Sequence, residues 1–314
     1  MTLIQMEYFI TAATELNFTK AATKLSITQQ SLSASIAALE NELGCQLFVR
    51  RVPLELTYAG NVFLKYANDI LRKIDALKHD FSDIRSDQRG ILRIGIAPTR
   101  GRSIMPDIID RFRKQYPGIQ IVVKEDTNDG LRQDILNGDI DIAIANFETD
   151  RKGIVLRDFY NEEVVLFALD ELLDQCFGEE KENIIAELKN GNFTYLKSCP
   201  FVLGNPKDIA GKISTTILTA NSIQPITLVN ADNVELLLAL CLKGIGFCFC
   251  PIVLAKTVLS KEQYQSLHKF HLGDMGKYQI RFGYREEERI WSVLSSFMEI
   301  AVDTMQNMEY WKHP

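Results

Sequence analysis

The chain has 314 residues and a net charge of −6, with 46% hydrophobic and 24% charged residues. These proportions are ordinary for a soluble globular protein, and the length is sufficient for two or three domains with cores of their own. Residues 1–10 hold no basic residue of the kind that opens a signal peptide, and no run of about 18 apolar residues is present. We therefore expect a cytoplasmic protein without a membrane partner.

Residues 16–57 predict a short helix, a tight turn, a second helix and a two-stranded wing. Thr19 is the expected N-cap of the first helix, whose run KAATKL is rich in good helix formers. Thr28 is expected to cap the second helix, which runs to about Leu43. The apolar positions of that helix are spaced four, three and four apart, which predicts one buried face: Leu32, Ile36, Leu39 and Leu43.

The N-terminal end of the second helix is polar. Gln29, Gln30 and Ser33 lie off the apolar face, where a helix that enters a DNA groove presents side chains to base edges. Gln can form two hydrogen bonds with adenine, and Ser can bind bases or phosphates. On these residues alone, the alternative is an ordinary helical hairpin with a solvated polar face.

Residues 6–60 resemble the N-terminal domain of LysR-type transcriptional regulators. The matching positions are Phe9, Phe18, Thr19, Ala21, Ala22, Leu25, Gln29, Leu32, Ser33, Ile36, Leu39, Glu40, Leu43, Gly44, Leu47, Phe48, Arg50, Leu56, Thr57, Ala59 and Gly60. The resemblance implies a winged helix-turn-helix domain over residues 1–58 that binds double-stranded DNA at a palindromic operator, with RNA polymerase as a further partner.

The DNA-binding residues expected from the pattern and the resemblance are Lys20, Thr28, Gln29, Gln30, Ser31, Ser33, Ala34, Arg50 and Arg51. Two positions depart from the family. Gln30 stands where Pro is usual, and Ala34 stands where a basic residue is usual. The operator preference is therefore expected to differ from that of the family.

Residues 1–58 lack the basic character that DNA-binding domains usually carry. Four basic residues (Lys20, Lys24, Arg50, Arg51) stand against five acidic ones (Glu7, Glu15, Glu40, Glu42, Glu55), a balance of −1. We expect DNA affinity to depend on the placement of the basic residues, on helix N-termini that meet phosphates and on dimerisation. The salt dependence of binding should be moderate.

Residues 59–89 predict a long linker helix with a narrow apolar seam. The seam residues alternate four and three apart over about three heptads, as in a coiled coil: Phe63, Ala67, Ile70, Ile74, Leu77, Phe81 and Ile84. Such a seam needs a second copy of the chain, and the resemblance agrees, since LysR-type regulators dimerise through this helix. The alternative is a helix packed on its own domain. We expect a homodimer or homotetramer, with a hinge at residues 86–90.

From Ile91 onward, β-rich runs alternate with helices, which predicts an α/β body. The expected strands are 91–97, 119–125, 140–146, 164–169, 201–204, 225–229, 244–251 and 278–284. Together with Gly90–Gly95, Asp141–Ile144 and Lys243–Gly246, they resemble the effector-binding domain of the same family. The resemblance implies a two-lobed, type 2 periplasmic-binding-protein-like domain over 90–314. Lobe I is expected near 90–161 and 270–314 and lobe II near 162–269, and the match is weakest at 170–200.

The effector site is expected at the carboxyl ends of the strands, where open α/β sheets bind ligands. The first strand ends at Ala97, and free backbone N–H groups, hydroxyls and two arginines follow, which suits an anion such as a carboxylate. The expected effector-binding residues are Pro98, Thr99, Arg100, Arg102, Ser103, Asn146, Phe147, Asn205, Lys207 and Asp232. Alternatively, the two arginines lie at the surface while Thr99 and Ser103 cap the helix.

The sequence holds no Ser-His-Asp order, phosphate-binding loop or dinucleotide glycine fingerprint, so we expect no enzyme and no cofactor. We expect no bound metal either, because His268, His271 and the six cysteines form no closed ligand set. A small-molecule-binding protein with a helical appendage and a thiol redox sensor of the same fold are the alternatives to a regulator. The sensor is disfavoured, because Cys199 lacks a flanking motif that would lower its pKa.

Overall fold

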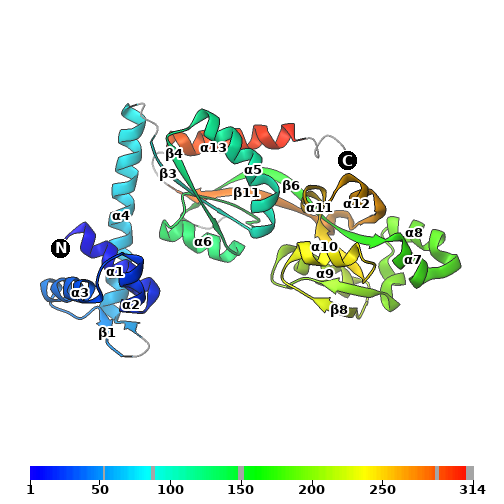
Figure 1. The fold of residues 1–314 in the computed structure, drawn as a ribbon, viewed down its shortest axis with the longest axis horizontal. Coiled ribbons are helices and arrows are strands. Elements are labelled where there is room, and N and C mark those ends of the chain that lie inside the picture. The colour runs from blue at the N-terminus through cyan, green and yellow to red at the C-terminus, as the bar shows by residue number, and fades with distance from the viewer. Residues whose placement is uncertain (52–53, 86–88, 148–151, 287–289, 309–314) are drawn as a thin grey trace. The chain divides into compact units, whose positions relative to one another are not determined.

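The computed structural model describes the chain except residues 52–53, 86–88, 148–151, 287–289 and 309–314 (Figure 1). The chain divides into two compact units, Met1–Gly90 (unit 1) and Ile91–Pro314 (unit 2). In the part of the chain that the structure describes, every helix is too short or too polar to cross a bilayer.

Unit 1 is helical apart from a small wing. Its elements are α1 (Leu3–Glu15), α2 (Phe18–Lys24), α3 (Gln29–Leu43), β1 (Phe48–Val49), β2 (Glu55–Leu56) and α4 (Tyr58–Arg85). The N-cap of α2 is Asn17, whereas the sequence pattern predicts Thr19. The Asn17 side chain accepts hydrogen bonds from the backbone N–H groups of Thr19 (2.9 Å) and Lys20 (3.0 Å). Asn is the stronger N-cap of the two, which accounts for the difference.

The core of unit 1 joins the helices to the wing. The ring of Phe9 in α1 lies 5.1 Å from that of Phe48 in β1 and 4.9 Å, edge-on, from that of Phe63 in α4. Ala21 and Ala22 of α2 are buried, and their small side chains allow the neighbouring helices to approach closely. This packing fixes the orientation of α3 relative to the wing and to the first turns of α4.

Unit 2 is built on a continuous sheet. Its strands are β3 (Gly90–Ile96), β4 (Ile119–Glu125), β5 (Ile142–Ala145), β6 (Ile154–Leu169), β7 (Pro200–Leu203), β8 (Ile226–Asn230), β9 (Phe247–Pro251), β10 (Leu267–His271) and β11 (Lys277–Arg285). Its α-helices are α5 (Pro98–Gln115), α6 (Asn128–Asn137), α7 (Asp170–Phe177), α8 (Lys181–Lys189), α9 (Ile209–Ala220), α10 (Val234–Cys241), α11 (Ile252–Val258), α12 (Lys261–Ser266) and α13 (Ser292–Asn307). The sequence pattern misses β10 and residues 154–163 of β6.

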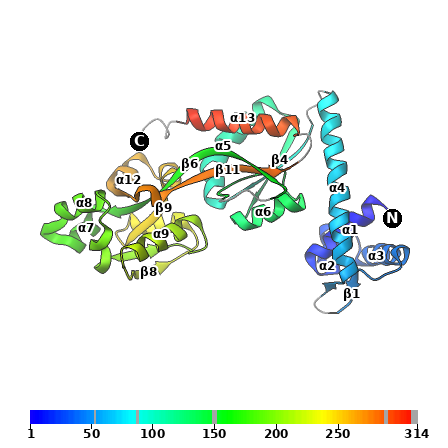
Figure 2. The same cartoon turned by 180° about the vertical axis from the view of Figure 1, so that it is seen from behind.

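The sheet carries two lobes that share β6. The strand order is β4-β3-β5-β11-β6-β9-β7-β8, with β10 also paired to β6. Residues 154–163 of β6 pair with β11, whereas residues 164–169 pair with β9 and β10. Figure 2 shows β6 passing from the lobe that holds α5, α6 and α13 to the lobe that holds α7 to α10. The chain therefore crosses between lobes near Glu163 and again between β10 and β11.

Residues 170–200, where the family resemblance is weakest, are not an open loop. They form α7 and α8, followed by a short 3-10 segment, η2 (Phe193–Ser198). Leu173 and Leu188 are fully buried and share a hydrophobic cluster with Phe201 and Phe270 of the sheet. This segment is therefore an integral part of the second lobe.

Candidate DNA-binding surface and effector pocket

The N-terminal end of α3 is exposed and well capped. The Thr28 hydroxyl oxygen accepts a hydrogen bond from the backbone N–H of Ser31 (3.1 Å), as the sequence predicts, and the two hydroxyls lie 2.8 Å apart. Gln29, Gln30, Ser31 and Ala34 are exposed, and Ser33 is half-buried. The first turn of α3 thus presents polar side chains from a fixed backbone.

The opposite face of α3 is buried at three of the four predicted positions. Leu32, Ile36 and Leu39 are fully buried in the core of unit 1. Leu43 is exposed, which corrects the prediction. The helix ends at this residue, and the next one, Gly44, takes a left-handed conformation with φ of 68°. The chain therefore turns away before a fourth residue can join the core.

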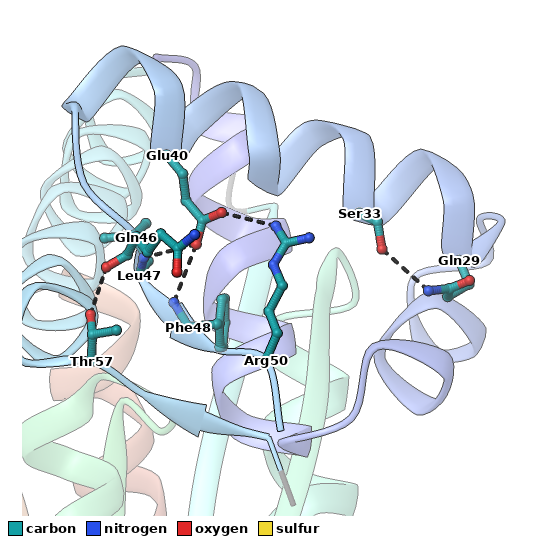
Figure 3. A network of polar contacts seen from close by, with 8 residues as sticks. All are labelled: Gln29, Ser33, Glu40, Gln46, Leu47, Phe48, Arg50 and Thr57. Carbon is teal, nitrogen blue, oxygen red and sulfur yellow. Dashed lines mark hydrogen bonds and ion pairs between the residues drawn. The ribbon is translucent and has the colours of Figure 1, made fainter. Parts of the chain in front are cut away.

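Glu40 joins α3 to the wing (Figure 3). Its buried carboxylate accepts hydrogen bonds from the backbone N–H groups of Leu47 (2.8 Å) and Phe48 (3.2 Å). Its other oxygen accepts one from the Arg50 guanidinium at 2.9 Å. At the far end of the helix, the Gln29 amide donates to the Ser33 hydroxyl at 3.2 Å. Helix and wing are thus held as one rigid surface.

Three of the four basic side chains in residues 1–58 pair with carboxylates of the same unit. Arg50 pairs with Glu40, Lys24 pairs with Glu15 at 2.8 Å, and Arg51 pairs with Glu55. Lys20, on α2, is exposed. Exposed ion pairs such as Arg51–Glu55 are worth about 1 kcal/mol or less, so a phosphate can replace that carboxylate at little cost, whereas the buried Glu40 holds Arg50 more strongly. The predicted basic contacts are therefore accessible, although the local field is nearly neutral.

The predicted seam of α4 is divided between two environments. Phe63 packs against Phe9 in the core of unit 1, and Ala67 is fully buried. Ile70 and Ile74 are half-buried. Leu77 and Phe81 are 54% and 51% exposed, and the side chain of Ile84 lies outside the described residues. The helix thus packs on its own domain at its start and presents an apolar stripe further along.

Unit 2 contains a pocket of about 550 Å³ between its two lobes. The walls come from the N-terminal ends of α5, α6, α9 and α10, and from Pro251 at the end of β9. Six of the predicted effector-binding residues line it: Pro98, Thr99, Arg100, Asn205, Lys207 and Asp232. The sequence reasoning missed Asp126, Asp129, Asp208 and Lys212. Asp126 and Asp129 could have been found, because they follow the carboxyl end of the predicted strand 119–125.

Arg100 is the most unusual side chain of the pocket. It is only 5% exposed, and its Nε and Nη1 atoms are buried without a hydrogen-bond partner. Its guanidinium lies 6.0 Å from the centre of the Tyr278 ring. A buried donor that lacks an acceptor costs about 1–3 kcal/mol. The alternative in which this arginine merely lies at the surface is therefore wrong.

Glu162 lies near Arg100 where β6 passes between the lobes. The Glu162 carboxyl is fully buried and accepts weak hydrogen bonds from the backbone N–H groups of Glu163 (3.3 Å) and Val253 (3.4 Å). Burial raises the pKa of Glu162 to about 7, and the positive charge of Arg100 limits that rise. Glu162 therefore exchanges its proton near neutral pH and is an incomplete counter-charge for the arginine.

The other predicted effector residues lie beside the pocket. Arg102 donates to Glu235 of α10 at 2.5 Å, so it links the two lobes. The Ser103 hydroxyl donates to the Thr99 carbonyl at 2.8 Å. Asn146 donates from its side chain to the Gln279 carbonyl at 2.9 Å.

Phe147 lies in a hydrophobic core and not on the pocket wall. Its ring is fully buried together with Leu131 and Ile135 of α6 and packs against Gly283 of β11, where a Cβ atom would come within 2.4 Å of the ring. The prediction that Phe147 lines the cleft is therefore wrong. The position at the end of a strand was correct, but the side chain faces α6.

The cysteines of unit 2 are poor redox groups. Burial raises the pKa of the Cys199 and Cys176 thiols and raises that of Cys241 to about 12. Cys248 and Cys250 are fully buried, with pKa values raised well above the usual range. Because the thiolate is the reactive form, the raised pKa values disfavour reaction of these thiols. Among the described residues, no group of three or more His, Cys, Asp or Glu side chains is arranged to hold a metal ion.

Comparisons with known proteins match both units. Residues 3–61 match the model of the bacterial regulatory helix-turn-helix proteins of the lysR family, and residues 85–306 match the LysR substrate binding domain. The HTH-type transcriptional regulator YtlI of Bacillus subtilis (strain 168) is 34% identical over 145 residues, 46% of this chain and 46% of that protein. The chain spans 46% to 65% of the length of the first curated relatives it matches.

Solved full-length structures share the fold. CbnR in complex with its target DNA has a TM-score of 0.62 and 22% identity, over 97% of this chain and 100% of that one. A full-length OxyR variant from Pseudomonas aeruginosa has a TM-score of 0.69 and 16% identity, over 98% of this chain and 96% of that one. At these identities the likeness concerns the architecture: a winged helix-turn-helix, a long helix and a two-lobed α/β body.

Proposed function

This chain belongs to the LysR family of transcriptional regulators, and from that premise we propose that it binds double-stranded DNA through α3 and an anionic small molecule through the pocket of unit 2. The observation that carries the DNA-binding half is the capped, exposed first turn of α3. The observation that carries the ligand-binding half is Arg100, which is buried with two donors that lack partners.

The DNA-binding surface consists of α3 and the wing. Gln29 and Gln30 are exposed, and we expect them to donate to and accept from base edges, while the exposed Lys20, Arg50 and Arg51 are expected to meet phosphates. The related CbnR has been solved with its target DNA, which supports the same use of this unit here. A DNA-binding regulator acts in the compartment that holds the chromosome, so we infer a cytoplasmic location.

A dimer follows from the weak charge of one unit and from the exposed part of the α4 seam. Leu77 and Phe81 offer apolar area that a second α4 would cover, and two copies would bind two half-sites of a palindrome. A tetramer and a contact with RNA polymerase belong to the same proposal. Replacing Leu77 by Glu should lower the mass measured by analytical ultracentrifugation, whereas Lys65→Glu, on the exposed side of the same helix, should not. Equal masses for both variants would contradict the α4 interface.

The ligand is expected to be an anion, a carboxylate being the simplest, because the buried Nε and Nη1 donors of Arg100 have no acceptor. A charge-assisted hydrogen bond is worth about 1.5–3 kcal/mol, which offsets the cost of burying the donors of Arg100. The alternative of a thiol sensor is disfavoured by the raised pKa values of the buried cysteines.

Selection from a pool of random duplex DNA tests the DNA-binding function. The full chain should enrich one palindromic motif, and Gln30→Ala should change the preferred base at symmetric positions of it. Gln46→Ala is the matched control, because Gln46 is an exposed glutamine outside α3. Enrichment of no motif would overturn the proposed function, and an unchanged motif for Gln30→Ala would remove Gln30 from base recognition.

A further inference from the structure

We propose, building on the anion site of the proposed function, that the pocket ligand is a zwitterion that carries an ammonium group as well as a carboxylate. The carboxylate binds Arg100 in one lobe, and the ammonium group lies beside Asp208 and Asp232 of the other lobe. This arrangement follows from the charges that line the pocket.

The arginine side of the pocket favours an anion. The buried Nε and Nη1 atoms of Arg100 have no acceptor, and Ala97, the N-cap residue of α5, makes no side-chain cap hydrogen bond. Glu162 is the nearby carboxyl group of the protein, yet it forms no hydrogen bond with Arg100 in the structure and is partly protonated at neutral pH because burial raises its pKa. A ligand carboxylate supplies the missing acceptor.

The opposite side of the pocket has an excess of carboxylates. Asp208 caps α9 through one oxygen, which accepts from the Gly211 backbone N–H at 2.6 Å. The pKa of Asp208 is raised, chiefly by burial and also by the negative charge of Asp232. A cation placed beside Asp208 and Asp232 would stabilise the negative charge of both carboxylates. Asp126 reaches the same pocket from the β4–α6 turn.

A second ligand carboxylate fits this side poorly. It would meet Asp208 and Asp232, and like charges at short range are repelled. Lys207 and Lys212 also line the pocket, but they are exposed and therefore screened more strongly by solvent than the half-buried Asp208. The volume of about 550 Å³ is ample for a small zwitterion. Because Arg100 and Asp208 belong to different lobes, one zwitterion would connect them.

The test is calorimetric titration of the full chain with matched pairs that differ only in the second charge. The zwitterions γ-aminobutyrate, δ-aminovalerate, ε-aminocaproate and L-norvaline are compared, in that order, with glutarate, adipate, pimelate and propylmalonate. We expect the tightest ligand of the panel to be a zwitterion that binds at least about tenfold more tightly than its dicarboxylate, a ratio that corresponds to about 1.4 kcal/mol.

Variants separate the two halves of the proposal. Asp208→Asn with Asp232→Asn should reverse the preference toward the dicarboxylate, and Asn at position 208 retains the helix cap. Asp274→Asn, at a fully exposed site off the pocket, is the matched control and should leave the preference unchanged. Arg100→Gln should remove binding of both members of a pair.

The outcomes are distinguishable. If a dicarboxylate binds more tightly than its zwitterion, and Arg100→Gln removes that binding, the zwitterion proposal is overturned. The anion site of the proposed function then remains supported. A zwitterion preference that persists in the double Asn variant would overturn the role of Asp208 and Asp232. Absence of binding by every carboxylate in the panel would overturn the anion site and the zwitterion together.

Discussion

The basic residues of unit 1 and the arginine of the pocket are in opposite situations. Arg50 and Arg51 are at the surface and already paired with carboxylates, whereas Arg100 is buried and has donors without partners. The exposed Arg51–Glu55 pair can exchange its carboxylate for a phosphate at a cost of about 1 kcal/mol or less, whereas the exchange costs more for Arg50, because its partner Glu40 is buried. A buried unpaired arginine lowers stability until an anion reaches it. The first situation suits a large, salt-sensitive partner, and the second suits a small ligand.

The largest expected effect is the loss of ligand binding in Arg100→Gln. Two charge-assisted hydrogen bonds, worth about 1.5–3 kcal/mol each, predict a fall in carboxylate affinity of at least about a hundredfold. Arg102→Gln is the matched control, because Arg102 pairs with Glu235 and does not line the pocket. Calorimetric titration measures the carboxylate affinity of both variants. A similar loss of affinity in both would contradict a specific role of Arg100 in ligand binding.

Removing the carboxylate that pairs with Arg50 should disrupt the wing. Glu40→Ala leaves the N–H groups of Leu47 and Phe48 without an acceptor and should destabilise the contact between α3 and the wing by about 3 kcal/mol. Hydrogen exchange at those two amides, followed by mass spectrometry, should be faster. Glu40→Gln keeps an acceptor and should cost about 1 kcal/mol. Unchanged exchange in Glu40→Ala would show that the wing does not depend on this residue.

Glu162 should make the stability of unit 2 depend on pH. Its folded pKa of about 7 lies above the ordinary value of 4.5, so the stability that it contributes is complete below pH 4.5 and is lost as the pH rises through 7. The difference of about 2.5 between the two pKa values corresponds to about 3 kcal/mol. Urea unfolding monitored by tryptophan fluorescence measures the free energy of unfolding at each pH. Between these pH values that free energy should fall by about 3 kcal/mol less in Glu162→Gln than in the unchanged chain. Parallel pH profiles would contradict this assignment.

The smallest expected effect concerns the exposed ion pair of the wing. Arg51→Gln should change the free energy of unfolding by less than about 1 kcal/mol. If Arg51 meets a phosphate, the slope of log affinity against log salt concentration should fall by about 1 per subunit. Fluorescence anisotropy with the selected operator at several salt concentrations measures the slope. An unchanged slope would mean that the Arg51–Glu55 pair persists on DNA.

The local patterns of the sequence were sufficient for much of the fold. Thr28 as a helix cap, the buried Leu32 and Ile36, and the position of each expected strand follow from periodicity and turn chemistry over a few residues. The strand-end rule placed Thr99 and Arg100 on the pocket. It also selected Phe147, because a rule for where a strand ends does not say which way the next side chain faces.

The parts that the sequence did not predict depend on contacts between distant residues. Glu40 binds wing amides seven and eight residues away, and Val253 donates to Glu162 across 91 residues. The division of the α4 seam results from Phe63 meeting Phe9 in the tertiary fold. The spacing of residues within one helix or strand does not predict contacts with distant elements. The burial of Arg100 and Glu162 could therefore be recognised only in the structure.

The most direct test of the regulatory account measures operator affinity with and without the tightest carboxylate of the panel, by fluorescence anisotropy, for the unchanged chain and for Arg100→Gln. Binding free energies are coupled reciprocally, so a ligand that regulates must change DNA affinity. We predict a change of about fivefold or more in the unchanged chain and none in Arg100→Gln, which should bind the operator normally without ligand. A ligand that occupies the pocket and leaves operator affinity the same, or an equal response in both proteins, would contradict the account.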